Sequence, residues 1–175
     1  FLQISYGFSQ TWCRKKDFPA AGRAAPTGFS LDGYGYLTNG WFSGTSNSQE
    51  LWQYNPLTND WLQKTSFPGL SRRGSIALEI GDTAYIGLGF NGSSTYYDVY
   101  AYSSQSDTWT QVTNYPGSGG RVSFGATVNG KGYVGGGEVG SGSVKRDFWE
   151  FNPSTSTWTS LGNFPFGNRS HGIAE

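Results

Sequence analysis

The sequence has very few of the residues that bind metals or form disulfides. Its 175 residues include one cysteine, one histidine and no methionine. Cys13 has no second cysteine to pair with, so no disulfide can form within the chain. A zinc or copper site built from histidine and cysteine needs more ligands than Cys13 and His171 supply. We therefore expect no metal site and no cofactor.

The sequence also lacks an excess of either charge and several common motifs. Twelve basic residues balance twelve acidic ones, which argues against a nucleic-acid partner. No serine-hydrolase elbow is present, and the glycine runs do not precede a helix as phosphate loops do. No stretch keeps a helical apolar period, so we predict almost no helix and no membrane-spanning segment.

What the sequence does contain is a repeat of about 49 residues. Four tryptophans lie at intervals of 49, 48 and 49 positions, namely Trp12, Trp61, Trp109 and Trp158. Each is followed by an aromatic–proline pair and then by an arginine, and we assign these arginines to equivalent positions: Arg23, Arg72, Arg121 and Arg169. Repeats of this length are typical of solenoids and propellers.

Each repeat predicts four short strands joined by hairpin turns. Asp32-Gly33, Gly81-Asp82 and Asn129-Gly130 have the composition of tight turns. Glycines that allow close approach or positive φ end the second strands, at Gly87, Gly89, Gly136 and Gly137. We predict a single all-β domain over 1–175, with complete four-stranded blades at 27–66, 67–114 and 115–163, a partial leading blade at 1–26 and the start of another at 164–175.

The combination of an arginine, an aromatic followed by glycines, and an aromatic seven residues before a tryptophan resembles the kelch repeat. This resemblance covers roughly residues 10–175 and implies a kelch-type β-propeller. The phrases at 51–56 and 147–153 resemble kelch proteins exported by Bacteroidetes-type bacteria. That resemblance implies an exported protein, either periplasmic, associated with the outer membrane or extracellular. Residues 1–9 fit either the tail of a secretory signal or an ordered strand.

The repeated tryptophans and arginines have an architectural interpretation. We expect Trp61, Trp109 and Trp158 to be largely buried on the outermost strand of each blade, and residues 10–16 to form the first copy of that strand. The planar arginine forks are expected to cross between neighbouring blades and to bond loop carbonyls.

Two hypotheses about function follow. The first is a non-enzymatic binding or scaffold module that holds a protein or a glycan on its variable loops, 43–49, 90–96 and 138–146. Its candidate binding residues are Trp41, Phe90, Tyr96, Glu138, Lys145 and Arg146. The alternative is a kelch-type sugar-processing enzyme resembling an epimerase. Its acid–base candidates, Glu79, Glu138, His171 and the arginines, form no constellation by spacing, so we expect no catalytic residues and favour the binding module.

The strand count predicts an arc rather than a closed ring. Residues 1–16 offer at most two strands of a leading blade, and 170–175 offer one strand of a following blade. The absence of methionine indicates a processed, truncated or incompletely assigned chain. We expect missing blades or other chains to cover the open faces of the arc.

Overall fold

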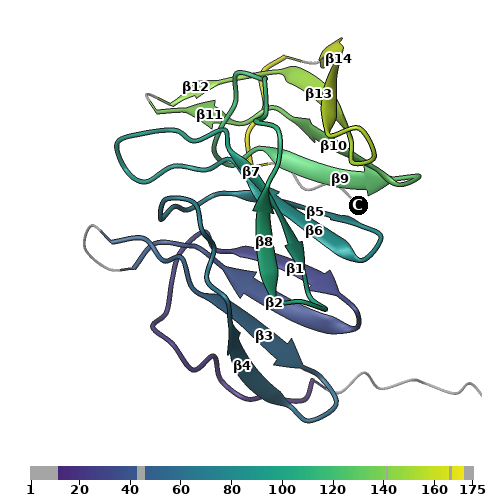
Figure 1. The fold of residues 1–175 in the computed structure, drawn as a ribbon. Helices are drawn as coiled ribbons and strands as arrows, with labels where there is room; N and C mark the ends of the chain where they lie inside the picture. Colours follow the sequence, from purple (N-terminus) through teal and green to yellow (C-terminus); the bar gives the residue numbers. More distant parts are fainter. Residues whose placement is uncertain (1–11, 43–45, 141, 166, 172–175) are drawn as a thin grey trace, which may run out of the picture.

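The structure is a computed structural model that describes residues 12–42, 46–140, 142–165 and 167–171. These residues form fourteen strands, and no helix occurs among them. Three four-stranded antiparallel sheets account for all the strands except two short ones, which pair as a ribbon. The prediction of an all-β chain with three complete four-stranded units is confirmed, and Figure 1 shows the sheets one after another.

We call the three sheets blade 1, blade 2 and blade 3. Blade 1 contains β1 (Thr27–Leu31), β2 (Tyr34–Thr38), β3 (Leu51–Asn55) and β4 (Asp60–Lys64). Blade 2 contains β5 (Ile76–Ile80), β6 (Thr83–Gly87), β7 (Val99–Ser103) and β8 (Thr108–Gln111). Blade 3 contains β9 (Phe124–Val128), β10 (Lys131–Gly135), β13 (Asp147–Asn152) and β14 (Thr157–Asn163). The ribbon of β11 (Glu138–Val139) and β12 (Ser143–Val144) lies between β10 and β13 in sequence.

The first hairpin of each blade has the predicted turn. Asp32 and Gly33 have φ values of 51° and 80°, and Asn129 and Gly130 have values of 50° and 73°. Two successive left-handed residues are what a type I′ hairpin turn requires. In blade 2 the turn begins with Gly81 at a φ of 64°.

The inner strands β1, β5 and β9 lie next to one another, so the blades pack face to face. Phe29, Leu31 and Tyr36 of blade 1 share one buried cluster with Ala84 and Ile86 of blade 2. A second cluster joins blades 2 and 3 through Ile76, Leu78, Ile80, Val134 and Phe151. Burial of apolar area between successive blades therefore holds the arc together.

A second repeated contact joins the blades near their outer strands. The aromatic of each aromatic–proline pair packs edge-on against the tryptophan that follows it by one repeat, at centroid distances of 5.2, 5.3 and 5.1 Å for Phe18–Trp61, Phe67–Trp109 and Tyr115–Trp158. The indole Nε1 of each tryptophan donates to a backbone carbonyl of the preceding repeat, at Lys16, Thr65 and Thr113. The repeated aromatic–proline and tryptophan positions therefore connect adjacent repeats.

The tryptophan prediction holds for three of the four residues and is wrong for the first. Trp61, Trp109 and Trp158 lie on the outermost strands as expected, and each is partly buried. Trp12 is fully exposed, and residues 12–18 form no strand. A strand needs a neighbour to complete its backbone hydrogen bonds, and no described residue supplies one here. The other residues of the expected leading strand, 10 and 11, lie outside the described part of the chain.

Candidate functional site

The connections between the second and third strands of the blades emerge at one edge of the arc, on the left of Figure 1. These connections carry the loops that vary between repeats. In each, two residues with positive φ precede the first loop residue: Asn39 and Gly40, Leu88 and Gly89, and Gly136 and Gly137. The chain then enters each loop at equivalent positions, Trp41, Phe90 and Glu138. We call the surface around these three residues the loop face.

Each of these loop residues pairs with the segment that leads into its own blade. Isolated antiparallel bridges join Ala24 to Trp41, Arg73 to Phe90 and Arg121 to Glu138. The bridging partners are therefore also equivalent, and at this position blades 2 and 3 carry an arginine where blade 1 has Ala24. The backbone thus positions Arg73 and Arg121 beside the loop residues.

The two arginines lie against aromatic rings of the loop face. The Arg73 guanidinium carbon lies 5.3 Å from the centroid of the Trp41 ring and 5.7 Å from that of Phe90. The Arg121 guanidinium carbon lies 4.7 Å from the centroid of Phe90 on the same surface. Arg121 also forms an ion pair with Glu138 at 2.9 Å. The order Trp41, Arg73, Phe90, Arg121, Glu138 forms an alternating series across the three blades, and we call it the ladder.

The ladder corrects our alignment of the repeated arginines. Arg23 and Arg72 do occupy equivalent positions, but Arg121 lies one residue later and matches Arg73. The backbone hydrogen bonds show this shift, because Gly40 donates to the Arg72 carbonyl whereas Gly89 donates to the Gly120 carbonyl. The interval from Trp61 to Trp109 is 48 residues, one fewer than the intervals on either side. The position equivalent to Arg72 is therefore Gly120, and a count of 49 residues from Arg72 ends one residue too far, at Arg121.

The first pair of repeated arginines has a structural role that sequence reasoning described only in part. Arg72 is fully buried and donates to the Leu70 and Leu88 carbonyls, as expected, but its fork also holds Asp98 at 2.5 and 2.8 Å. Arg23 holds the equivalent acid, Glu50, at 2.6 Å. Each of these ion pairs lies within one repeat. The forks of Arg23 and Arg72 therefore do not cross between neighbouring blades, as we had expected them to.

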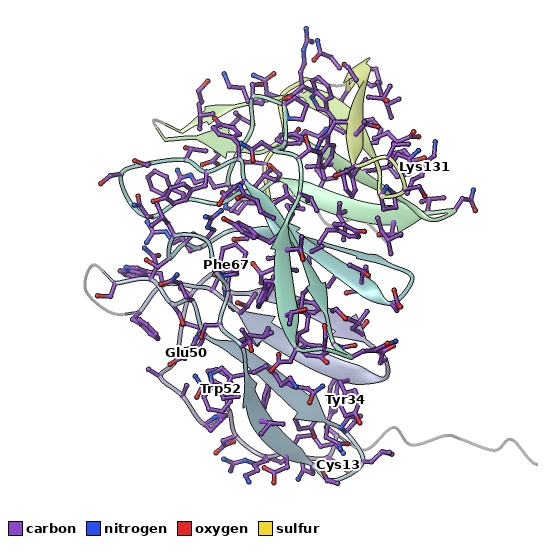
Figure 2. All side chains as sticks on the ribbon, in the orientation of Figure 1. Cys13, Tyr34, Glu50, Trp52, Phe67 and Lys131 are labelled. Carbon is purple, nitrogen blue, oxygen red and sulfur yellow. The ribbon has the colours of Figure 1, made fainter. Side chains whose placement is uncertain are left out.

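The acids at the equivalent position of the three blades, Glu50, Asp98 and Asp147, differ in their surroundings. The hydrogen bond from the Arg23 guanidinium lowers the pKa of Glu50, although partial burial opposes this effect. The Trp52 indole donates to the same carboxylate at 3.2 Å, and Figure 2 shows Trp52 beside Glu50 in blade 1. In blade 3 the third acid, Asp147, instead accepts hydrogen bonds from the backbone and hydroxyl of Ser118 and from the Trp149 indole.

Two of the candidate binding aromatics, Phe90 and Tyr96, are not exposed residues of the loop face. The Phe90 ring is buried, because Arg73 and Arg121 both lie against it. Tyr96 is half-buried, with the Arg72 guanidinium carbon 4.4 Å from its ring centroid and its hydroxyl bonded to the Asn91 amide. Trp41 remains partly exposed.

The segment 138–146 is a paired ribbon rather than an open loop. Val139 and Glu138 pair with Ser143 and Val144 in β11 and β12. The Lys145 backbone bonds to Gly137 and Arg169, and the Arg146 carbonyl accepts from Phe164. Among these residues Arg146 is exposed and Lys145 is half-buried. The structure brings Glu138 into the ladder, whereas the side chains of Lys145 and Arg146 form no hydrogen bond or ion pair with any described residue.

The acid–base candidates of the enzyme hypothesis lie in two places. Glu79 lines a hollow of about 470 Å³ beside the inner strands, where it accepts hydrogen bonds from the backbone and hydroxyl of Ser30. Glu138 lies on the loop face with His171, whose Nδ1 is 3.7 Å from the carboxylate. Glu138 is also bound by Arg121 at one carboxylate oxygen and by Ser170 at the other.

The described residues contain no group of three or more histidine, cysteine, aspartate or glutamate side chains that could hold a metal ion. No helix long and apolar enough to cross a membrane occurs in the same part of the chain.

Comparison with known proteins supports the fold alone. No protein-family model matches the sequence, and no curated protein matches it. Many solved chains have a similar structure. A structure of YjhT, a kelch-repeat protein, superposes with a TM-score of 0.80 at 16% sequence identity. The superposition covers 93% of this chain and 58% of YjhT, so this chain matches part of a kelch propeller and spans little more than half of that protein.

Proposed function

We propose that this chain is a non-enzymatic binding module that holds a protein or a glycan on its loop face, and that the bound partner carries an acidic group. The observation that supports the proposal is the environment of Arg73. Arg23, Arg72 and Arg121 each form an ion pair with a carboxylate. Among the described residues, Arg73 forms no ion pair and no side-chain hydrogen bond, although two aromatic rings lie against it.

An arginine in this environment is suited to an external anion. The Trp41 and Phe90 rings that flank the Arg73 guanidinium provide no acceptor oxygen for its N–H groups. A guanidinium fork in this situation binds a carboxylate or sulfate through two parallel hydrogen bonds. The partly exposed Trp41 ring offers a flat apolar surface beside it, on which a sugar ring or an aliphatic side chain can lie. The ladder therefore provides one charged contact and one stacking contact.

The proposal is tested by binding screens with matched variants. The chain is applied to an array of neutral, carboxylated and sulfated glycans and to an array of acidic and neutral peptides. We expect selective retention of acidic ligands by the wild type and a loss of roughly 10-fold or more in affinity for Arg73→Gln. Arg14→Gln is the control, because Arg14 is exposed and pairs only with nearby Asp17. Equal binding by wild type and Arg73→Gln, or no preference for acidic ligands, would contradict the proposal.

We also propose that the protein is exported, to the periplasm, the outer membrane or the cell exterior. The support is the resemblance of the strand phrases at 51–56 and 147–153 to exported kelch proteins. Fractionation of the native source, with a cytoplasmic enzyme as marker, tests this point. Recovery of the protein with the cytoplasmic marker would contradict it.

A further inference from the structure

The carboxylate of Glu138 joins the ladder to the following repeat. Its Oε2 lies 2.9 Å from the Nη2 of Arg121, and its Oε1 accepts a hydrogen bond from the Ser170 hydroxyl at 2.9 Å. Ser170 follows Arg121 by 49 residues, which is the interval of the repeat, so the two residues occupy equivalent positions. The His171 Nδ1 lies 3.7 Å from the same Oε1. Both carboxylate oxygens of Glu138 are therefore held by equivalent positions of successive repeats.

The two arginines of the ladder differ in how their charges are balanced. The Arg121 guanidinium forms its ion pair with Glu138, whose side chain is only 14% exposed. Arg73 forms no ion pair with any described residue, and the rings of Trp41 and Phe90 lie against it. Arg121 lies against the same Phe90 ring. The ladder thus has a balanced charge on the side of blade 3 and an unbalanced one on the side of blade 1.

The fold does not require a carboxylate at position 138. The Glu138 N–H donates to the Arg121 carbonyl at 2.9 Å, and its carbonyl accepts from the Arg121 N–H at 3.1 Å. The same bridge holds Trp41 in blade 1 and Phe90 in blade 2, and neither of these residues is an acid. The main chain therefore fixes the loop residue in all three blades, and the charge of Glu138 is available for another role.

A second acidic group on a ligand held by Arg73 can extend in two directions along the ladder. Toward blade 1 it meets Trp41 and Ala24, neither of which carries a charge. Toward blade 3 it meets Arg121, whose charge is balanced, and then the Glu138 carboxylate. Like charges brought together across an interface weaken binding and so reject the wrong ligand.

We propose that Glu138 determines the class of ligand that the loop face accepts. It restricts the face to ligands that present one acidic group, and it rejects ligands that present a row of them. This inference rests on the proposed function, because it places the acidic group of the ligand at Arg73. Removing the charge of Glu138 releases Arg121 and gives the ladder two unbalanced guanidinium groups beside one phenylalanine ring.

The test follows the arginine Nε–Hε signals of the 15N-labelled chain by NMR during titration with two probes. Methyl sulfate carries one charge, and a heparin-derived hexasaccharide carries many. In the wild type, methyl sulfate should shift the Arg73 signal and leave the Arg121 signal in place. Affinities are taken from these two signals alone, so that binding at the basic run 14–16 does not contribute.

Variants of Glu138 separate its charge from its structural contact. In Glu138→Gln, methyl sulfate should shift both arginine signals, and the hexasaccharide should bind roughly 10-fold more tightly than to the wild type. Glu138→Asp keeps the charge and should bind the hexasaccharide as weakly as the wild type does. The double variant Glu138→Gln/Arg121→Gln should lose the gain, because the released cation is gone.

Asp82→Asn is the matched control. It also removes one negative charge, but from the exposed hairpin turn between β5 and β6, at the other end of β6 from the loop face. Its hexasaccharide affinity should equal that of the wild type. Melting curves confirm that each variant is folded.

The outcomes distinguish this inference from the proposed function. If methyl sulfate shifts Arg73 but the hexasaccharide binds the wild type and Glu138→Gln equally, this inference alone is overturned. A methyl sulfate shift at Arg121 in the wild type, or a gain that persists in the double variant, would also overturn it. No shift of the Arg73 signal in any of these proteins would overturn the proposed function together with this inference.

Discussion

Phe67 is the residue whose removal tests the packing between blades most sharply. Its side chain is fully buried in the cluster that joins blades 1 and 2. Its ring lies edge-on to Tyr100 and Trp109 of blade 2, at 5.1 and 5.3 Å. The Arg72 guanidinium carbon lies 4.9 Å from the same ring. Truncation of this side chain therefore opens a cavity in the middle of the arc.

The expected magnitude follows from these contacts. Replacing a fully buried phenylalanine by alanine costs about 3–5 kcal/mol, and the edge-on aromatic pairs place Phe67 toward the upper part of that range. For a chain of this length, each kcal/mol lowers the melting temperature by roughly 2–4 °C. Phe67→Ala should accordingly lower it by about 6–20 °C.

The assay is urea unfolding followed by tryptophan fluorescence, with calorimetry at one fixed protein concentration. Phe18→Ala is the matched control, because Phe18 makes the same edge-on contacts with Trp52 and Trp61 but is half-exposed. We expect it to cost less than half as much as Phe67→Ala. The reasoning fails if Phe67→Ala costs under about 1 kcal/mol, or if the two variants are equally destabilised.

Three further predictions concern backbone approach, a buried ion pair and acid stability. Gly87→Ala should destabilise the chain by about 1–3 kcal/mol, because its Cβ would lie 2.5 Å from the Asp98 carbonyl oxygen, whereas Gly22→Ala has open space and should be neutral in the same urea titration. Arg72→Gln should cost about 3–5 kcal/mol, because it leaves the Asp98 carboxylate without its buried partner; a melting curve like that of the wild type would contradict this. The pKa of Glu50 is lowered in the folded state, so its pair with Arg23 contributes stability above about pH 4.5 that is lost as the pH falls below it. Glu50→Gln should reduce stability at neutral pH and narrow the difference from wild type in acid, and parallel pH profiles would refute this.

The sequence predicted the parts of the fold that depend on local chemistry. The tryptophan spacing identified the three outer strands, and Asp32-Gly33 and Asn129-Gly130 identified two turns with left-handed residues. These features follow from strand propensity and backbone conformation, which act within a few residues. The strand expected at residues 10–16 was wrong in its described part because a strand also requires a neighbour, which spacing does not reveal.

The candidate site was harder to predict because it depends on register between repeats. Trp41, Phe90 and Glu138 were each singled out, but their equivalence was not recognised. Arg73 was missed entirely, although the 48-residue interval between Trp61 and Trp109 contained the signal. Applying that interval instead of 49 to Arg73 leads directly to Arg121. The burial of Phe90 could not have been predicted, because it depends on two arginines from different repeats.

The measurement that tests the central claim most directly is a thermodynamic cycle on Arg73 and its ligand. An acidic ligand retained in the screens is compared with its neutral amide by titration calorimetry, against wild type and Arg73→Gln. We predict that the variant binds the acid roughly 10-fold more weakly and binds the amide as the wild type does, because the two changes remove the same interaction. An equal loss of affinity for the acid and the amide would contradict the account, because Arg73 would then not contact the acidic group.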